Sequence, residues 1–343
     1  MENIRELIFI NFEGKRVLNL SGQALSTVPE VGTIITKVGE VHVLDLSNNH
    51  LTELPTSINK LKTLEVLKLD NNQLSELPET IGELINLTKL SVKNNQLSEL
   101  PETIGELINL TELSVKSNLL SELPETIELQ RLDLTNNQLM SLPDGIGELV
   151  ELWWLDVSIN QLSVLPASVT HLKKLQELNL TNNQLMSLSD DIGELVELEV
   201  LDVSNNLLSV LPASVTHLKK LQRLYLANNR LMSLPDDIGE LVELWWLDVS
   251  NNQLSVLPAS VTHLKKLQEL DLENNRLMSL PDDIGDLEVK EMLVRLDVNG
   301  NPLTVEAVRR VVKLQEKIKM RTPMACISFQ VSIKHSHLLS STL

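Results

Sequence analysis

Residues 64–74 read LEVLKLDNNQL, and this stretch decides the fold. Its pattern is Leu-x-x-Leu-x-Leu-x-x-Asn-x-Leu, sometimes with Val in the sixth place, and it returns along the chain at a usual spacing of 23 residues. A repeat of this length predicts a solenoid in which each unit contacts only its neighbours. A first, degenerate copy has Gln23 in the Asn position, and the Asn itself falls at 49, 72, 95, 118, 137, 160, 183, 206, 229, 252, 275 and 301.

Each part of the pattern has a structural reason. The alternating leucines 67 and 69 predict a short strand with one buried face. After the strand the chain turns, and the amide of Asn72 is both a donor and an acceptor. It can therefore pair backbone groups that would otherwise be costly to bury. Leu77-Pro78 then fixes the path of the chain to the opposite side of the repeat. An Ile-Gly-x-Leu-x-x-Leu segment leads back to the next strand.

The repeats resemble the leucine-rich repeat family, in its intracellular LPxxIxxLxxL class, over roughly residues 17–303. The resemblance implies an α/β fold, a right-handed leucine-rich-repeat solenoid (horseshoe) with a parallel β-sheet on the concave face. It further implies about 13 repeats and helical caps at both ends. The chain looks most like bacterial members of the family, including Legionella-type secreted effectors.

The sequence predicts four segments. Residues 1–16 are expected to form an N-terminal helical cap, and residues 17–303 carry the repeats. Residues 304–322 have apolar side chains at helical spacing, and Thr304 is suited to the N-cap position. They predict an amphipathic C-terminal capping helix. Residues 323–343 are Ser-rich and have no pattern, so we expect a flexible tail.

The charge balance argues against nucleic acid and anionic membranes as partners. The 343 residues include 47 Asp and Glu against 29 Lys and Arg, which gives a net charge of −18, whereas phosphate binding needs clustered cations. No apolar stretch is long enough to span a membrane, and the N-terminus does not resemble a secretory signal peptide. The single cysteine, Cys326, suits a reducing compartment. We expect a cytoplasmic protein.

The sequence predicts no catalytic residue, metal site or cofactor. His171, His217 and His263 recur two repeats apart, which places each about 10 Å from the next, too far to share one ion. The phosphate-loop motif Gly-x-x-x-x-Gly-Lys-Ser/Thr does not occur. Cys326 lies in a tail too short for the catalytic domain that bacterial leucine-rich-repeat ubiquitin ligases carry. We therefore expect a non-enzymatic protein.

The outward positions of the strands predict a binding surface. Positions three, five and seven of each unit point away from the core, because neighbouring strand residues alternate faces. All four Trp and the only Tyr of this aromatic-poor chain fall at positions two, three or five, and Trp, Tyr and Arg are enriched in interface hot spots. The predicted protein-binding residues on the concave face are Trp153, Trp154, Trp245, Trp246, Tyr225, Arg131, Arg223, Glu177, Glu269, Asp156, Asp202, Asp248, Asp271, Lys68, Lys89, Lys93 and Lys116.

Two features organise this predicted surface. Arg131 neighbours Trp154 on the next strand, and Arg223 neighbours Trp246 in the same way, so we expect cation–π stacking in both places. Lysines gather in the earlier repeats and aspartates in the later ones. The two Trp pairs lie 92 residues apart, two copies of a 46-residue unit. Duplication alone therefore explains the second pair, and an incidental placement of the rings stays an alternative.

The function favoured by these patterns is that of a bacterial virulence effector that binds a protein target and inhibits or modulates it. The target could be an enzyme whose active site the solenoid covers, an idea that rests on fold analogy. Such an effector would enter the host cytoplasm by a non-Sec route. Two alternatives stay open. One is a cytosolic signalling scaffold of the Ras-pathway or plant type, and the other is the substrate-recognition part of a ubiquitin ligase that lacks its catalytic domain.

Overall fold

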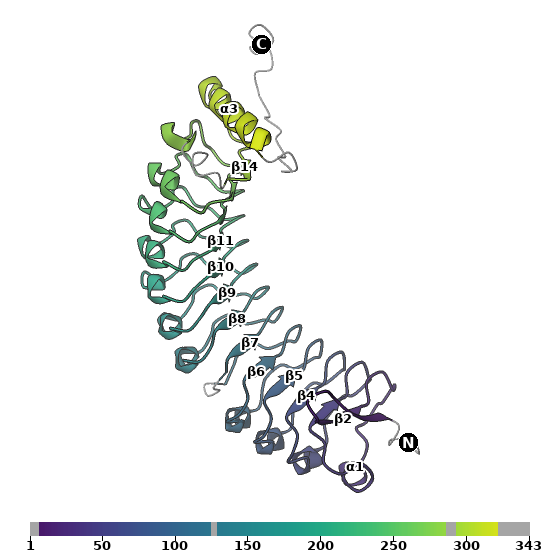
Figure 1. The fold of residues 1–343 in the computed structure, drawn as a ribbon. Helices are drawn as coiled ribbons and strands as arrows, with labels where there is room; N and C mark the ends of the chain where they lie inside the picture. The colour runs from purple at the N-terminus through teal and green to yellow at the C-terminus, as the bar shows by residue number, and fades with distance from the viewer. Residues whose placement is uncertain (1–6, 125–128, 286–292, 322–343) are drawn as a thin grey trace. The chain divides into compact units, whose positions relative to one another are not determined.

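The computed structural model describes residues 7–124, 129–285 and 293–321. The chain divides into two compact units, unit 1 (residues 1–175) and unit 2 (residues 176–343). Within each unit, short strands lie along one side and single turns of 3-10 helix along the other (Figure 1). In the described ranges, no helix is long and apolar enough to cross a lipid bilayer.

The strands of unit 1 follow one another in chain order across a sheet. From β2 onward they pair in parallel, and their central leucines stand opposite one another, as Leu67 does to Leu90. The register is kept across the one shortened repeat, where Leu113 stands opposite Leu132. The strands are β1 (Ile8–Ile10), β2 (Arg16–Asn19), β3 (Val43–Asp45), β4 (Val66–Lys68), β5 (Lys89–Ser91), β6 (Glu112–Ser114), β7 (Arg131–Asp133) and β8 (Trp154–Asp156).

Unit 2 has the same arrangement. Its strands pair in parallel, and Leu224 stands opposite Leu247 in the same register. The predicted leucine-rich-repeat solenoid with its parallel sheet is thus confirmed in each unit. The strands of unit 2 are β9 (Glu177–Asn179), β10 (Val200–Asp202), β11 (Arg223–Tyr225), β12 (Trp246–Asp248), β13 (Glu269–Asp271) and β14 (Arg295–Asp297).

The described 3-10 helices follow the Leu-Pro step of the repeat, except that η7 follows Leu188-Ser189. Pro78, for example, has φ −68° and ψ 145° and directly precedes a 3-10 helix, whose first turn closes when the Ile81 N–H donates to the Pro78 carbonyl (2.9 Å). In unit 1 these helices are η2 (Thr56–Lys60), η3 (Glu79–Glu83), η4 (Glu102–Glu106), η5 (Asp144–Glu148) and η6 (Ala167–His171). In unit 2 they are η7 (Ile192–Glu194), η8 (Ala213–His217), η9 (Ile238–Glu240), η10 (Ala259–His263) and η11 (Asp282–Gly285).

The glycine of the Ile-Gly step lets neighbouring 3-10 helices approach each other closely. A Cβ atom on Gly82 would lie 2.3 Å from the carbonyl oxygen of Thr103, and one on Gly239 would lie 2.1 Å from that of Ser260. Both distances are far below van der Waals contact. A larger residue would therefore push the adjacent repeats apart.

Leucines form the core, and a buried asparagine completes each repeat. Leu69 is fully buried, and Asn72 is only 8% exposed. The Asn72 amide nitrogen donates to the carbonyls of Leu69 (2.9 Å) and of Leu46 in the preceding repeat (3.0 Å). Its oxygen accepts from the Leu51 N–H (3.0 Å). The predicted pairing of backbone groups is confirmed, and each such group left unpaired would cost about 1–3 kcal/mol.

The described part of the predicted N-terminal helix is a strand instead. Residues 1–6 lie outside the described residues, and β1 pairs antiparallel with β2, with Phe9 opposite Val17. A tight turn joins the two strands. In it the Asn11 side chain accepts from the Lys15 N–H (2.9 Å), and Gly14 takes a left-handed φ of 78°. The helix prediction at residues 1–16 is therefore wrong for residues 8–10, because this β-branched and aromatic run pairs with the open sheet edge.

Two α-helices complete the described elements. In the first long connection α1 (Val31–Val38) buries Val31, Ile34 and Val38. At the end of unit 2, α3 (Val305–Arg321) begins after Thr304, whose hydroxyl accepts from the Ala307 N–H (3.3 Å) as an N-cap does. The predicted flexible tail, residues 323–343, lies outside the described residues.

Candidate protein-binding surface

The solvent-facing side of the sheet, called here the strand face, carries the predicted binding residues. Within each strand the central leucine points into the core and its two neighbours point outward. In β8, Leu155 is 1% exposed, whereas Trp154 and Asp156 are half-buried. The same alternation holds in β11 and β12 of unit 2. The strand face is therefore made of side chains that the core does not use.

Unit 1 carries a first aromatic cluster, composed of Arg131, Trp153 and Trp154. Arg131 stands opposite Trp154 in the sheet register. Its guanidinium carbon lies 4.7 Å from the ring centre of Trp154 and 4.9 Å from that of Trp153. Both rings thus hold the same cation, at a distance where cation–π attraction is effective. The predicted Arg131–Trp154 stacking is confirmed.

Unit 2 carries a second aromatic cluster, composed of Arg223, Tyr225, Trp245 and Trp246. Here Arg223 lies over Trp245 (5.8 Å) and not over Trp246 as predicted. Trp246 instead packs against Tyr225 (ring centres 5.9 Å apart) and edge-to-face against Trp245 (5.8 Å). The prediction for Trp246 is wrong because a tyrosine on the neighbouring strand offers an aromatic partner that the first cluster lacks.

Burial and charge both act on Tyr225. Partial burial of the ring raises the pKa of its hydroxyl, and Arg223 opposes this rise, while the carboxylates of Asp202 and Asp248 add to it. Asp202 and Asp248 stand on either side of Tyr225 in the sheet register. The second cluster therefore lies between carboxylates.

The predicted lysines lie on the strand face of unit 1, and they differ in their partners. Lys89 pairs with Glu112 at 2.8 Å, and Lys68 lies 3.7 Å from Asp45. Within the described residues, neither Lys93 nor Lys116 forms an ion pair. A hollow of about 360 Å³ opens among Lys68, Lys89 and Lys93, whereas Lys116 does not line it.

The aspartates at position five of the strands have a structural role that the sequence analysis missed. Asp156 accepts a hydrogen bond from the Ser158 N–H (2.9 Å), Asp202 from that of Ser204 (2.9 Å), Asp248 from that of Ser250 (2.9 Å) and Asp271 from that of Glu273 (3.0 Å). These bonds close the turn after the strand. The recurring Asp-x-Ser spacing is the sequence signal for it in three of these four turns, and Asp271 is followed by Glu273 instead.

The last two strands of unit 2 carry a cluster of charged side chains on the strand face. Arg295, which the site prediction omits, lies 3.4 Å from Asp271, 3.7 Å from Asp297 and 3.8 Å from Glu269. The pKa of Asp271 is nevertheless raised to about 6, chiefly by burial of its carboxyl group. The nearby carboxylates of Asp248 and Asp297 raise this pKa further. The hydrogen bond from the Glu273 backbone and the positive charge of Arg295 lower it, but by less. Glu177 on β9 is half-buried as well.

Three of these carboxylates converge as metal ligands would. Oxygens of Asp271, Glu273 and Asp297 lie within 4.8 Å of one another. However, the guanidinium of Arg295 already lies against two of them. The cluster is a network of ion pairs, and it gives no independent sign of a bound cation.

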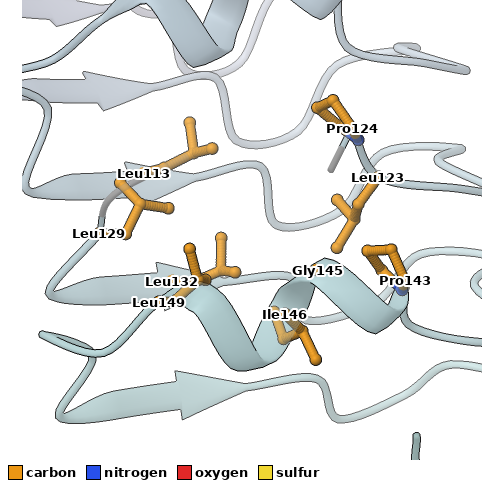
Figure 2. Close-up of a pocket in the computed structure, with 9 residues that line it drawn as sticks. All are labelled: Leu113, Leu123, Pro124, Leu129, Leu132, Pro143, Gly145, Ile146 and Leu149. Carbon is orange, nitrogen blue, oxygen red and sulfur yellow. The ribbon is translucent and has the colours of Figure 1, made fainter. Parts of the chain in front are cut away.

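A second, apolar pocket lies inside unit 1, away from the strand face (Figure 2). Its volume is about 20 Å³, and its lining is apolar, so it offers no polar side chain that would orient a ligand. It adjoins the shortened repeat, in which the spacing between Asn118 and Asn137 is 19 residues. The labelled residues around it are Leu113, Leu123, Pro124, Leu129, Leu132, Pro143, Gly145, Ile146 and Leu149.

Comparison with known proteins gives the family. Models of the leucine-rich repeat match residues 2–122, residues 127–254 in three overlapping segments, and residues 266–287. A solved leucine-rich repeat protein of Leptospira interrogans is 34% identical, over 88% of this chain and 94% of that one, with a TM-score of 0.60. The chain is a leucine-rich repeat protein.

Other solved leucine-rich repeat proteins are similar to this one over most of its length. YopM, a leucine-rich effector protein of Yersinia pestis, is 29% identical, over 83% of this chain and 77% of that one, with a TM-score of 0.61. The plant peptide hormone receptor RGFR1, solved in complex with RGF2, is 27% identical, over 87% of this chain and 56% of that one, with a TM-score of 0.65. No curated protein sequence matches the chain significantly.

Proposed function

We propose that this leucine-rich repeat protein is a non-enzymatic interaction module that binds a protein partner through its strand face. One observation carries the proposal. The chain has only four Trp and one Tyr, and all five lie in the two aromatic clusters of the strand face, half-buried and outside the leucine core. Large rings beside arginines have the composition of an interface hot spot.

The fold supports the same proposal energetically. The outward side chains stand on strands whose leucines are packed and whose turns are closed by hydrogen bonds. A partner would therefore meet side chains that are already ordered, which limits the entropy lost on binding. Solenoid repeats use such extended faces to bind partners, and the similar plant peptide hormone receptor RGFR1 was solved in complex with RGF2.

A bacterial effector is the biological setting that we propose for this activity. Its support is the likeness to YopM, an effector protein, and to the Leptospira protein. In this setting the protein acts in the reducing cytoplasm of a host cell, and the bound partner is inhibited or modulated, for example when the partner is an enzyme whose active site becomes covered. An enzyme that keeps full activity in the complex would contradict the inhibitory role and leave the binding role standing.

The binding role is tested by replacing the rings. Trp153, Trp154, Trp245 and Trp246 are changed to Ala together, and a matched control carries Ala at Val164 and Val256. These valines are 55% and 66% exposed and lie outside the strands. Proteins from bacterial and host lysates are captured on each chain after equal folding is shown by circular dichroism and thermal unfolding.

We expect the native chain and the valine control to retain one common partner, and the Trp variant to lose it. The Kd of the isolated partner should rise at least 100-fold in the Trp variant, since hot-spot residues each contribute about 2 kcal/mol or more. Equal retention by all three chains would show that the partner binds elsewhere.

A further inference from the structure

The hollow on the strand face of unit 1 has the opposite charge from the rest of the chain. The protein as a whole carries a net charge of −18. The hollow is lined by the cationic side chains of Lys68, Lys89, Lys93 and Arg131 and by only two carboxylates, those of Glu112 and Asp133. Four cations against two anions leave a formal charge of about +2 inside a volume of about 360 Å³.

Both carboxylates of the hollow are already engaged by the protein. Glu112 pairs with Lys89 at 2.8 Å. Asp133 accepts from the hydroxyl of Ser114 (2.9 Å) and from the Thr135 N–H (3.1 Å). Glu112 is thus occupied by Lys89, whereas Asp133 keeps its negative charge, so the formal charge of the hollow stays at about +2.

Two cations are left to meet a ligand. Lys93 is half-buried and forms no ion pair with any described residue. Arg131 stacks its flat guanidinium on Trp153 and Trp154, and it forms no ion pair with any described residue. A stacked guanidinium keeps its N–H donors in its plane, where they can bind a carboxylate with two parallel hydrogen bonds.

We infer that this hollow binds an acidic segment of the protein partner. One carboxylate of the segment is held by Arg131 and another by Lys93, and a neighbouring apolar side chain of the segment packs on Trp154, which also lines the hollow. Partners without acidic groups gain nothing from the cations and would leave them desolvated. The inference rests on the proposed protein-binding function and names the chemistry of the partner at this place.

A labelled peptide tests the inference directly. The probe is a fluorescein-labelled peptide of alternating Asp and Gly with one central Phe, and matched peptides carry Asn or Lys in place of Asp. Binding to the full chain is followed by fluorescence anisotropy. We expect the Asp peptide to bind at least tenfold more tightly than the other two peptides, and its affinity to fall as salt is raised.

Two matched variants locate the binding. Lys93→Gln with Arg131→Gln should weaken the Asp peptide at least tenfold. Lys37→Gln with Lys60→Gln removes the same charge from exposed positions in α1 and η2 of the same unit and should leave the affinity unchanged. Thermal unfolding is compared first, so that only folded variants are used. Equal binding of the three peptides, no binding of the Asp peptide at millimolar concentration, or equal loss in both variants would overturn the inference. The inference would also be overturned if an oligonucleotide displaced the Asp peptide in a competition assay and the captured protein partner did not.

The captured partner separates this inference from the proposed function. In one outcome the Trp variant loses the partner, while the Lys93→Gln, Arg131→Gln variant retains it fully at every salt concentration. This outcome would overturn the inference that an acidic segment binds in the hollow, and the proposed binding surface would still stand. Retention of the partner by the Trp variant would contradict the binding surface itself.

Discussion

At the scale of single residues, the position before each buried asparagine has an unusual backbone. Asn71 there has φ 56°, in the left-handed region, and the same conformation recurs in the other repeats with φ between 53° and 57°. Asparagine tolerates this region better than most residues do. The second Asn of the Asn-Asn pair is thus buried and pairs backbone groups through its amide. The first Asn instead suits the position because it tolerates a left-handed backbone conformation. Ile159 occupies this position with φ 55°, although a β-branched residue is strained there.

Replacing Ile159 by Asn should therefore stabilise unit 1 by about 1 kcal/mol, because the left-handed strain costs roughly 1–2 kcal/mol and is largely removed. Chemical denaturation followed by circular dichroism measures the change. Ile108→Asn is the control, since Ile108 is 71% exposed and has no positive φ. A similar gain from both substitutions would assign the effect to surface hydrophobicity and not to the backbone.

Asp271 predicts a pH dependence of stability in unit 2. Its pKa is raised from 3.8 to about 6 in the folded protein, chiefly by burial, so the folded state favours the protonated acid. The stability that this acid contributes below about pH 4 is lost as the pH rises through about 6. Since Asp271 keeps some contact with solvent, we expect Asp271→Asn to stabilise the protein by about 1 kcal/mol at pH 8 and to have little effect at pH 4. Denaturation midpoints at both pH values check this, and a variant that is less stable at pH 8 would contradict it.

At the scale of elements, the repeat between Asn118 and Asn137 is the one that is shorter than 23 residues. Strands β6 and β7 keep their register across it, and the apolar pocket of Figure 2 lies beside it. In the preceding repeat, residues 100–110 read LPETIGELINL, whereas residues 123–129 read LPETIEL. Four residues are missing on the side of the 3-10 helices, and with them one leucine that other repeats bury there, such as Leu107.

Inserting Gly-Glu-Leu-Ile after Ile127 restores the 23-residue spacing, and the added leucine is expected to take the buried place that Leu107 has in the preceding repeat. Burial of one leucine contributes roughly 1.5–3 kcal/mol, so the free energy of unfolding should rise by an amount of this order. Inserting Gly-Glu-Ser-Ile at the same place is the matched control and should give a much smaller gain. Equal stability of the two insertions would show that the added leucine is not buried.

How far these elements could be predicted depends on how local their causes are. The strands, the Leu-Pro step and the role of Asn72 follow from residues close in sequence, and the structure agrees with them. The N-terminal strand depends on a free sheet edge that the residues at 8–10 do not reveal. The orientation of Trp246 likewise depends on Tyr225 in the preceding repeat, so cross-strand contacts decide what a single repeat cannot.

At the scale of the whole molecule, the net charge conceals a local reversal. The sequence predicts both the acidic balance and the early lysines, but it does not show which lysines are neutralised. Lys89 is paired with Glu112, while Lys93 has no ion-pair partner among the described residues. The charge that a partner must carry is therefore determined by the charged side chains that form no ion pair with a neighbouring repeat. The total charge instead governs solubility and long-range repulsion.

Because the amide of Asn72 bonds only within its own repeat and to the preceding one, tension applied between the ends of the chain should peel a unit apart repeat by repeat. Each 23-residue repeat that comes loose would lengthen the chain by roughly 76–83 Å, whereas the 19-residue repeat would add only about 63–68 Å. Optical tweezers would show these steps as a ladder with one short rung in unit 1. A single rupture of the whole unit would instead mean that its repeats share strain well beyond their nearest neighbours.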